Sequence, residues 1–273
     1  MKLTVLGSGT SQGIPVIGCG CPVCTSPDSR DKRTRCSLYI QGGGGERVVI
    51  DTGPEFRLQA LGAGIDRLDA VFLTHAHADH IQGLDDVRPL SREKPIPLYG
   101  NGPTIEEFRE RFAYIYRNTQ EGGGKPRLNG FVLSGPARVG GLTFTPIPVK
   151  HGKLDILGYA VTGESAGGGS PGGPARAVYL TDTSHIGEAA FTLIGRPGLL
   201  IVGALRVRPH ETHFSFDQAL EAAARIGADR SFLTHISHEH SHREIEDYCR
   251  NFTGTRGIKA EIGPAWDRLE LEL

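Results

Sequence analysis

The sequence predicts a mixed α/β fold, and three observations support this prediction. Short apolar runs rich in Val, Ile, Leu and Phe are separated by polar stretches with helical character. The composition, with 38% hydrophobic and 22% charged residues, is that of a globular protein. The length of 273 residues is sufficient for one large hydrophobic core. We therefore expect a single domain over residues 1–273.

The strands are expected where the apolar runs lie. In chain order they cover residues 3–6, 38–40, 48–50, 70–73, 143–147, 177–180, 199–202 and 231–233.

Three helices are expected between or after these strands. The first covers residues 103–116, where Pro103 suits a first helical turn. The second covers residues 215–226, where Ser215 can cap the start and Gly227 can end the helix. The third covers residues 242–250.

Three glycine-rich segments interrupt this pattern, at residues 42–45, 122–124 and 163–173. They have no periodicity, so we expect flexible surface loops or hairpin connections and assign them no function.

Charge and hydropathy limit the classes of partner. The N-terminal residues 1–7 contain too few apolar side chains for a signal peptide, and no run approaches the roughly 18 apolar residues that span a bilayer. A net charge of −1 provides no basic field for a long nucleic acid. We therefore expect a cytoplasmic protein without a membrane partner or a long nucleic-acid partner, acting on a small molecule.

Several apolar runs end in a polar residue that could bind a metal ion. Examples are Val-Val-Ile-Asp51, Phe-Leu-Thr-His75, Tyr-Leu-Thr-Asp182 and Phe-Leu-Thr-His235. If these runs are strands, the polar side chains emerge at strand ends, where α/β proteins tend to place ligand sites. The pattern therefore predicts one shared functional edge.

The segment from His75 to His80 carries the strongest chemical signal. It reads H-x-H-x-D-H, and a chance match in this composition is on the order of one in a thousand. His75 and His77 are two residues apart on an extended segment, so their side chains point the same way and can bind one ion. Asp79 and His80 follow as the chain turns into a helix and can face a second ion. Imidazole and carboxylate ligands suit zinc, manganese or iron.

Two metal ions need more ligands than this motif supplies. Residues at the ends of other expected strands could provide them, namely His151, Asp182 and His235. A lone histidine is more often not a ligand, but the strand-end context beside the motif favours ligation. Asp51, which also follows a strand, is expected to fix the loop behind the metals through hydrogen bonds and not to bind metal itself.

The chain resembles the metallo-β-lactamase superfamily of hydrolases, and within it the PhnP-type phosphodiesterases of phosphonate catabolism. The resemblance extends over nearly the full length. It is carried by residues 6–15, 18–24, 74–84, 151–154, 158–159, 180–183 and 234–238.

This resemblance implies a fold and a ligand set. The fold would be a four-layer αββα sandwich of two mixed sheets with the metals, Mn or Zn, at one edge. One metal would be held by His75, His77, His151 and Asp182. The other would be held by Asp79, His80, Asp182 and His235, so that Asp182 bridges both ions.

Cys19, Cys21 and Cys24 form a C-x-C-x-x-C cluster on a Gly/Pro-rich stretch, and this spacing can wrap three thiolates around one zinc ion. His238 could supply the fourth ligand from far along the chain, an arrangement that the resembled family has. The alternative is a set of reduced, partly buried thiols. We expect a structural zinc in an N-terminal loop around residues 19–24.

The resemblance also implies roles in catalysis for the metal ligand Asp79 and for His213. His213 precedes an expected helix and would give a proton to the leaving group, whereas the alternative is a helix-entry residue bonded to backbone. His210 is a weaker alternative donor. Lys153 and Tyr159 are candidates for contact with a substrate phosphate.

The expected function is hydrolysis of a small sugar or nucleotide phosphodiester, for example 5-phosphoribosyl 1,2-cyclic phosphate. Alternatives on the same metal edge are thioester, lactone or RNA 3′-end hydrolysis, and a metal-binding scaffold without turnover is a further alternative. Residues 111–125 and 163–173 have no clear counterpart in the resembled family, so the substrate could differ. Family habit suggests a homodimer.

Overall fold

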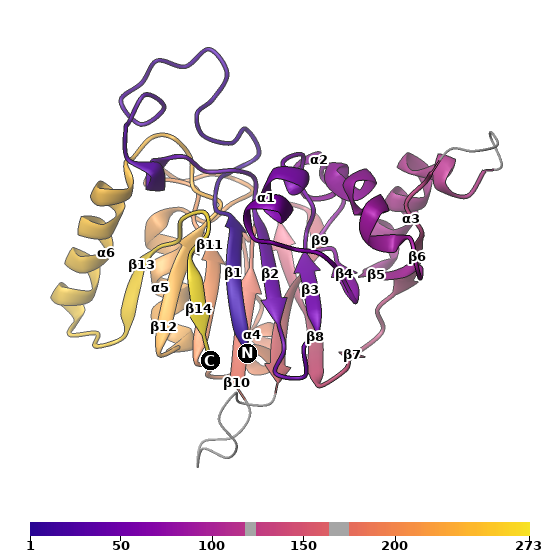
Figure 1. Ribbon diagram of the computed structural model, residues 1–273. Helices are drawn as coiled ribbons and strands as arrows, with labels where there is room; N and C mark the ends of the chain where they lie inside the picture. Colours follow the sequence, from indigo (N-terminus) through magenta and orange to yellow (C-terminus); the bar gives the residue numbers. More distant parts are fainter. Residues whose placement is uncertain (118–123, 164–174) are drawn as a thin grey trace.

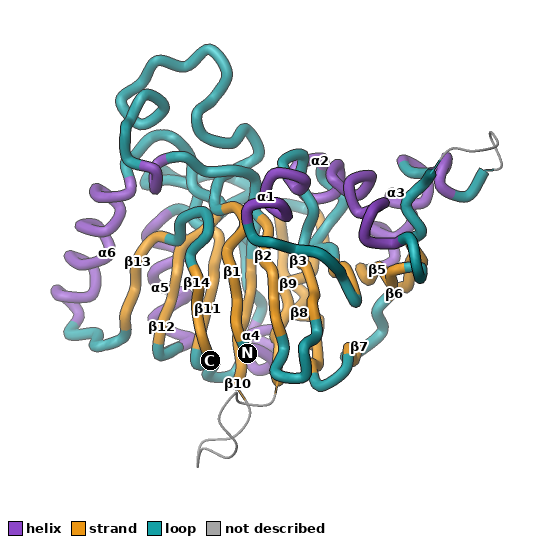
Figure 2. Tube along the Cα trace, viewed as in Figure 1, coloured by secondary structure: helices purple, strands orange, loops and turns teal. Residues whose placement is uncertain are grey.

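The computed structural model describes residues 1–117, 124–163 and 175–273. Two β-sheets lie face to face, and helices cover the outer face of each, so the described chain forms four layers (Figures 1 and 2). This arrangement confirms the predicted αββα sandwich.

The first sheet contains seven described strands and is mixed. Their order is β14 (Glu270–Glu272), β1 (Lys2–Gly7), β2 (Ser37–Gln41), β3 (Arg47–Ile50), β4 (Ala70–Phe72), β5 (Ile96–Gly100) and β6 (Leu128–Val132). Strands β3 to β6 run parallel, and the pairs from β14 to β3 are antiparallel.

The second sheet repeats this plan. Its order is β13 (Glu261–Pro264), β12 (Arg230–Thr234), β11 (Leu199–Gly203), β10 (Ala175–Leu180), β9 (Leu154–Gly163), β8 (Leu142–His151) and β7 (Ala137–Val139). Strands β10 to β13 are parallel, and β7 to β10 pair antiparallel. Because parallel strands run in the same direction, the C-terminal ends of several strands lie at one edge of each sheet.

The inner faces of the two sheets form the central core. Alternate residues of each strand point inward, such as Leu38 and Ile40 on β2, as period-2 side-chain alternation requires. Three aromatic rings interlock at the middle of this core. Phe72 of β4 stacks on Phe144 of β8 at 4.1 Å and meets the edge of Tyr159 of β9 at 5.3 Å.

Helices cover the outer faces. The first sheet is covered by α1 (Phe56–Gly62), α2 (Ala78–Ile81), the 3₁₀ segment η2 (Gln82–Ser91) and α3 (Gly102–Arg111), with η3 (Ala113–Ile115) after it. The second sheet is covered by α4 (Glu188–Ile194), α5 (Phe216–Ile226) and α6 (His242–Arg256). In α5, Phe216, Ala219, Leu220 and Ala223 form the buried stripe that a 3.6-residue period produces.

The N-terminal loop that contains η1 (Ser29–Asp31) rises above one end of the sandwich, and both chain termini lie at the other end (Figure 1). The amino group of Met1 donates to the carbonyl of Leu273 at 2.7 Å. Among the described residues, we find no helix with the length and apolar character needed to cross a membrane.

Each expected strand is present, with end points that differ by a few residues. The helix expected over residues 215–226 is confirmed with Ser215 as its cap and Gly227 in the left-handed conformation after it. The helix expected over 103–116 was too long, because α3 ends at Arg111 and a 3₁₀ turn follows. The third helix extends six residues beyond its expected end at 250, to Arg256.

The glycine-rich segments have different outcomes. Residues 42–45 form the turn between β2 and β3, as expected for a hairpin connection. Residues 122–123 and 164–173 lie outside the described residues, while Gly163 is the last residue of β9.

Candidate active site

The histidines and carboxylates predicted as metal ligands converge at one end of the sandwich. They come from the ends of four strands: the loop after β4, the last residue of β8, and the turns after β10 and β12. Their ligand atoms form two groups in which all atoms lie within 4.8 Å of one another. The first group is His75, His77 and His151, and the second is Asp79, His80, Asp182 and His235.

Three of the strand-end residues adopt a left-handed backbone conformation. Asp51, Asp182 and His235 have φ values of 62°, 52° and 57°. Such a conformation costs of order 1–3 kcal/mol for a residue with a Cβ, although Asp and His tolerate it better than most. These conformations therefore lower the stability of the fold, and they turn the side chains away from their strands and towards the shared site.

Asp51 orders the H-x-H-x-D-H loop. It is fully buried, and its Oδ1 accepts from the backbone N–H of Thr74 at 2.8 Å. Its Oδ2 accepts from the Thr74 hydroxyl at 2.8 Å and from Nδ1 of His80 at 2.7 Å. Because Thr74 uses its only hydroxyl proton on Asp51, its 3.0 Å contact with His75 requires Nδ1–H of His75 to donate. One carboxylate thus fixes this loop through hydrogen bonds, as expected of Asp51, and it also sets the tautomers of two histidines.

The remaining nitrogens of these rings point into the site. His75 Nε2 and His80 Nε2 are buried and have no hydrogen-bond partner in the described part of the chain. His151 donates from Nδ1 to the carbonyl of Thr212 at 2.7 Å, which leaves its Nε2 with a lone pair. His235 contacts the Thr10 hydroxyl through Nε2 at 3.1 Å, and its Nδ1 is buried without a partner. Metal-binding histidines in proteins are held in this way through the second ring nitrogen.

The spacing of the second group matches a metal site. His80 Nε2 lies 3.2 Å from both Asp79 Oδ2 and Asp182 Oδ2, and His235 Nδ1 lies 3.1 Å from Asp182 Oδ2. Ligand atoms about 2.0–2.2 Å from a tetrahedral zinc ion are roughly 3.3–3.5 Å apart. The unpaired buried nitrogens and the mixed His/Asp donor set therefore fit a divalent ion.

The electrostatics of the site also favour a cation. Burial opposes charge on His80, but Asp182, Asp51 and Asp79 raise its pKa well above the usual range. Burial opposes charge on Asp182 too, yet His235 and His80 hold its pKa well below the usual range. Burial similarly opposes charge on His235, whereas Asp182 raises its pKa to about 10. The carboxylates create a negative potential that a bound divalent ion would satisfy.

Two glycines allow the loop after β3 to approach α2. A Cβ on Gly53 would lie 2.3 Å from the carbonyl oxygen of Asp79, and a Cβ on Gly83 would lie 2.2 Å from the carbonyl oxygen of Gly53. Backbone hydrogen bonds from Thr52 to His80 and from Gly83 to Thr52 hold this contact. Close backbone approach therefore positions both Asp79 and His80.

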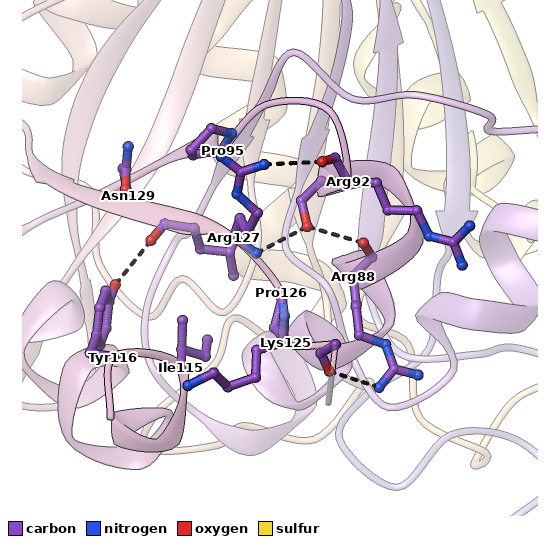
Figure 3. Close-up of a pocket in the computed structure, with 12 residues that line it drawn as sticks. Arg88, Arg92, Pro95, Ile115, Tyr116, Lys125, Pro126, Arg127 and Asn129 are labelled. Carbon is purple, nitrogen blue, oxygen red and sulfur yellow. Dashed lines mark hydrogen bonds between the residues drawn. The ribbon is translucent and has the colours of Figure 1, made fainter. Parts of the chain in front are cut away.

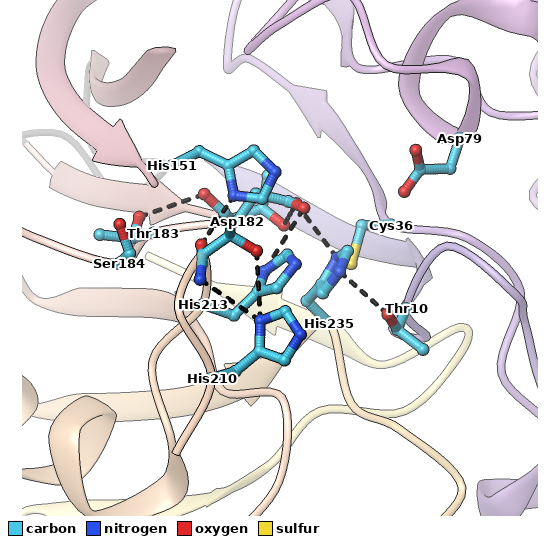
Figure 4. A network of polar contacts seen from close by, with 12 residues as sticks. Thr10, Cys36, Asp79, His151, Asp182, Thr183, Ser184, His210, His213 and His235 are labelled. Carbon is cyan, nitrogen blue, oxygen red and sulfur yellow. Dashed lines mark hydrogen bonds and ion pairs between the residues drawn. The ribbon is translucent and has the colours of Figure 1, made fainter. Parts of the chain in front are cut away.

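His213 lies beside Asp182 and His235 (Figure 4), and with His151 and Asp182 it forms a further group of ligand atoms within 4.8 Å of one another. Its Nδ1 is buried without a partner in the described residues and lies 3.7 Å from Asp182 Oδ1, and its ring is 4.6 Å from that of His151. Burial and the neighbouring His235 lower the pKa of His213 to about 3, so the ring is neutral near pH 7. His210 is exposed, 5.2 Å from the ring of His213, and its Nδ1 accepts from Thr212.

The cysteine cluster forms a second set of converging ligands. Cys19, Cys21 and Cys24 place their Sγ atoms 3.5, 3.4 and 3.5 Å from Nδ1 of His238. In a tetrahedral zinc site with one nitrogen and three sulfur ligands, these distances are about 3.6 Å. The backbone N–H of Cys24 donates to Cys21 Sγ, and with His238 it lowers the pKa of the Cys21 thiol to about 6.

The two residues predicted to contact a substrate phosphate lie in different environments. Lys153 is exposed in the turn between β8 and β9, two residues after His151. Tyr159 is completely buried between the sheets, where its hydroxyl donates to the carbonyl of Leu73 at 2.6 Å. The prediction for Tyr159 was wrong, because its position on β9 points the ring into the central core.

Two cavities bear on the position of the substrate. One of about 840 Å³ lies beside Arg88, Arg92, Lys125 and Arg127 (Figure 3). It adjoins the N-terminal ends of β5 and β6, whereas His75 follows the C-terminal end of the neighbouring parallel strand β4. A smaller cavity of about 240 Å³ touches His75 and His77 directly and is the one adjacent to the candidate metal site.

Threonines that support the ligands were missed in the sequence. Thr74 links Asp51 to His75, Thr181 donates to Asp182 Oδ2 at 2.7 Å, and Thr10 contacts His235. The repeated Leu-Thr before His75, Asp182 and His235 was a signal for two of them. No local pattern identifies Thr10, because it reaches His235 from 225 residues away.

Comparison with known proteins identifies the family. Residues 46–236, more than half of the chain, match the model of the β-lactamase superfamily domain. A crystal structure described as a new diphosphatase from the PhnP family is 38% identical, with a TM-score of 0.84 over 100% of this chain and 96% of that chain. The chain belongs to the metallo-β-lactamase superfamily. Within this superfamily it is PhnP-like, as the sequence indicated, and membership implies that the His/Asp cluster binds divalent metal ions.

Other superfamily relatives have different names. An octanoyltransferase of Porphyromonas gingivalis is 40% identical over 240 residues, which are 87% of this chain and 46% of that protein. Zn²⁺-bound PqqB from Methylobacterium extorquens has a TM-score of 0.77 at 20% identity, over 100% of both chains, and this shows a shared fold. The chain spans about half the length or less of the first curated relatives that it matches.

Proposed function

We propose that this chain is a dinuclear metal-dependent hydrolase that cleaves a small phosphodiester. The observation that carries the proposal is the pair of ligand groups at one end of the sandwich, with three histidines in one group and two histidines and two aspartates in the other. Buried nitrogens of His75, His80 and His235 have no hydrogen-bond partner among the described residues. The relation to a PhnP-family diphosphatase at 38% identity over the full chain supports phosphorus as the reacting atom. A cyclic sugar phosphodiester such as 5-phosphoribosyl 1,2-cyclic phosphate is our candidate substrate.

Bound divalent ions, Mn or Zn, would neutralise charge on the phosphoryl oxygens and acidify water. In this proposal His75, His77 and His151 would hold one ion and Asp79, His80 and His235 the other, and Asp182, a member of the second group, would contribute to holding both. The hydrogen bonds of Asp51 keep His75 and His80 in the tautomer with Nε2 free to bind.

His213 is our proposed proton donor to the departing alkoxide. It adjoins His151 and Asp182 but contributes no contact shorter than 3.7 Å to that carboxylate. To donate, the ring must be in the imidazolium form, which the negative charge of a bound phosphodiester would favour. It then gives one proton to the leaving oxygen as the bond to phosphorus breaks and returns to neutral imidazole. Exposed Lys153 remains a candidate contact for a further phosphate on the substrate.

A structural zinc at Cys19, Cys21, Cys24 and His238 is also part of the proposal. It would join the N-terminal loop to the segment that follows β12, only three residues beyond the ligand His235. Such a link couples the stability of that loop to the geometry of the active site.

The test uses protein purified without added metal. Elemental analysis and turnover of bis(p-nitrophenyl) phosphate are measured on the same sample, with and without Mn²⁺. We expect about one tightly held zinc per chain and diesterase activity that Mn²⁺ stimulates. Metal-loaded protein that leaves diesters intact but hydrolyses a thioester or lactone would reject the proposed substrate class, and RNA 3′-end cleavage would do the same.

A further inference from the structure

The cavity of about 240 Å³ beside His75 and His77 has a defined construction. Its floor is the H-x-H loop, one wall is α3, and the opposite wall is the start of β9. The side chain of Asn101, which caps α3, donates to the carbonyl of Asp155 at 2.9 Å and joins the two walls. The cavity is therefore a defined extension of the candidate active site, with walls formed by regular secondary structure.

One face of α3 supplies the polar groups of this cavity. Thr104, Glu107 and Arg111 are spaced i, i+3 and i+7, which places them on the same side of the helix. Arg111 donates from Nε to Oε2 of Glu107 at 2.8 Å, and a terminal nitrogen forms an ion pair with the same oxygen at 2.8 Å. Its other terminal nitrogen donates to the carbonyl of Ala76 at 2.9 Å. Arg111 thus positions the backbone between His75 and His77.

The charges within the cavity are paired. Glu107 neutralises Arg111, and Asp155 pairs with Lys150 at 2.7 Å. Oε1 of Glu107 has no hydrogen-bond partner among the described residues, and about half of its side chain is exposed. Leu154 and Ile156 add apolar surface. A neutral cavity with a carboxylate acceptor and apolar walls suits a sugar, which presents both hydroxyl groups and C–H faces, better than a second phosphate.

His151 lies beside both the cavity and His213. The ring of His77, which lines the cavity, is 5.1 Å from that of His151, and the ring of His151 is 4.6 Å from that of His213. The cavity, which His75 and His77 line, is therefore placed for a part of the substrate that lies next to the phosphate.

We propose that this cavity binds a hydroxyl-bearing sugar of the substrate, and that Glu107 accepts a hydrogen bond from a sugar hydroxyl. This inference rests on the proposed phosphodiesterase function. It makes Glu107 a specificity-determining residue and Arg111 a positioning residue.

The test compares two diesters with the same leaving group, ribose 5-(4-nitrophenyl phosphate) and ethyl 4-nitrophenyl phosphate. The measured quantity is the ratio of their kcat/KM values. We expect Glu107→Gln to lower this ratio about tenfold, because the amide keeps an oxygen for Arg111 but removes the free anionic acceptor. Glu106→Gln is the matched control, since this exposed neighbour lies about 100° around the helix.

An unchanged ratio in Glu107→Gln, or an equal fall in Glu106→Gln, would overturn the inference. Failure of the proposed function has a different signature, because metal-loaded wild-type protein would then hydrolyse neither diester. In that case NMR titration with methyl ribofuranoside tests the cavity alone. Shifts at residues of α3 that weaken in Glu107→Gln support the sugar site, and identical or absent shifts in the two proteins reject it.

Discussion

Replacing Asp51 by Asn tests how the site is held in its metal-binding form. Asn has nearly the same size as Asp and tolerates the left-handed φ of 62° at this position, so the backbone need not change. The substitution does change hydrogen bonding. Asp51 accepts three hydrogen bonds at 2.7–2.8 Å, two from Thr74 and one from His80.

An amide has one acceptor oxygen and one NH₂ donor, so it cannot accept all three of these bonds with the same geometry. If the NH₂ group faces His80, Nδ1 of His80 must give up its proton, and Nε2 then carries it and loses its lone pair. Loss of a partner of this kind weakens metal binding by about 10–100-fold, or roughly 1.4–2.7 kcal/mol. A buried donor left without a hydrogen-bond acceptor also lowers the free energy of unfolding by about 1–3 kcal/mol.

Two assays separate these effects. Competition with a chelator measures metal affinity, and urea unfolding of chelator-treated protein measures stability without metal. Asp229→Asn is the control, because it removes only an exposed ion pair with Arg196, which contributes at most about 1 kcal/mol. Wild-type metal affinity in Asp51→Asn would refute the assigned role of this carboxylate.

Four further predictions follow from other parts of the chain. His213→Ala should keep its metal content but lower kcat by about 10²–10⁴, whereas loss of metal would identify a ligand instead of a proton donor. His238→Ala should lose the tightly held zinc and several kcal/mol of stability, measured by elemental analysis and thermal unfolding, and retained zinc would reject the Cys₃His assignment. Tyr159→Phe should lower stability by about 1 kcal/mol without raising KM, because its buried hydroxyl donates to the backbone of Leu73 inside the core; a raised KM would instead indicate that Tyr159 contacts the substrate. Gly254→Ala should raise the unfolding free energy by up to about 1 kcal/mol, since a Cβ there in α6 meets no atom within 4 Å, and a destabilised variant would contradict this.

The strands and helices with strong local signals were predictable. The short apolar runs that become β1 to β4 are rich in Val, Ile, Leu and Phe and almost fully buried, and α5 has a cap at each end. The strands β5, β6, β7, β9, β13 and β14 were missed, and among them β5 and β13 contain proline and glycine, which local propensity disfavours in strands. Strands β5 and β13 form because a neighbouring parallel strand supplies their hydrogen bonds, and sequence propensity does not report that partner.

The sequence by itself determined the identity of the candidate metal ligands. His75, His77, Asp79 and His80 are adjacent, and ligand spacing is a local property that the order of residues displays directly. The repeated Leu-Thr-His and Leu-Thr-Asp runs also placed His235 and Asp182 at strand ends. Strand ends are readable in this way because an apolar run and its polar end are contiguous.

Only the tertiary structure decided how these residues are supported and what surrounds them. Asp51 reaches His80 across 29 residues, Thr10 reaches His235 across 225, and α3 places Arg111 over the backbone of Ala76. Tyr159 shows the same limit, because its burial depends on which face of β9 meets the first sheet. Contacts between distant segments depend on how the two sheets pack, and that packing is a property of the whole chain that no local pattern encodes.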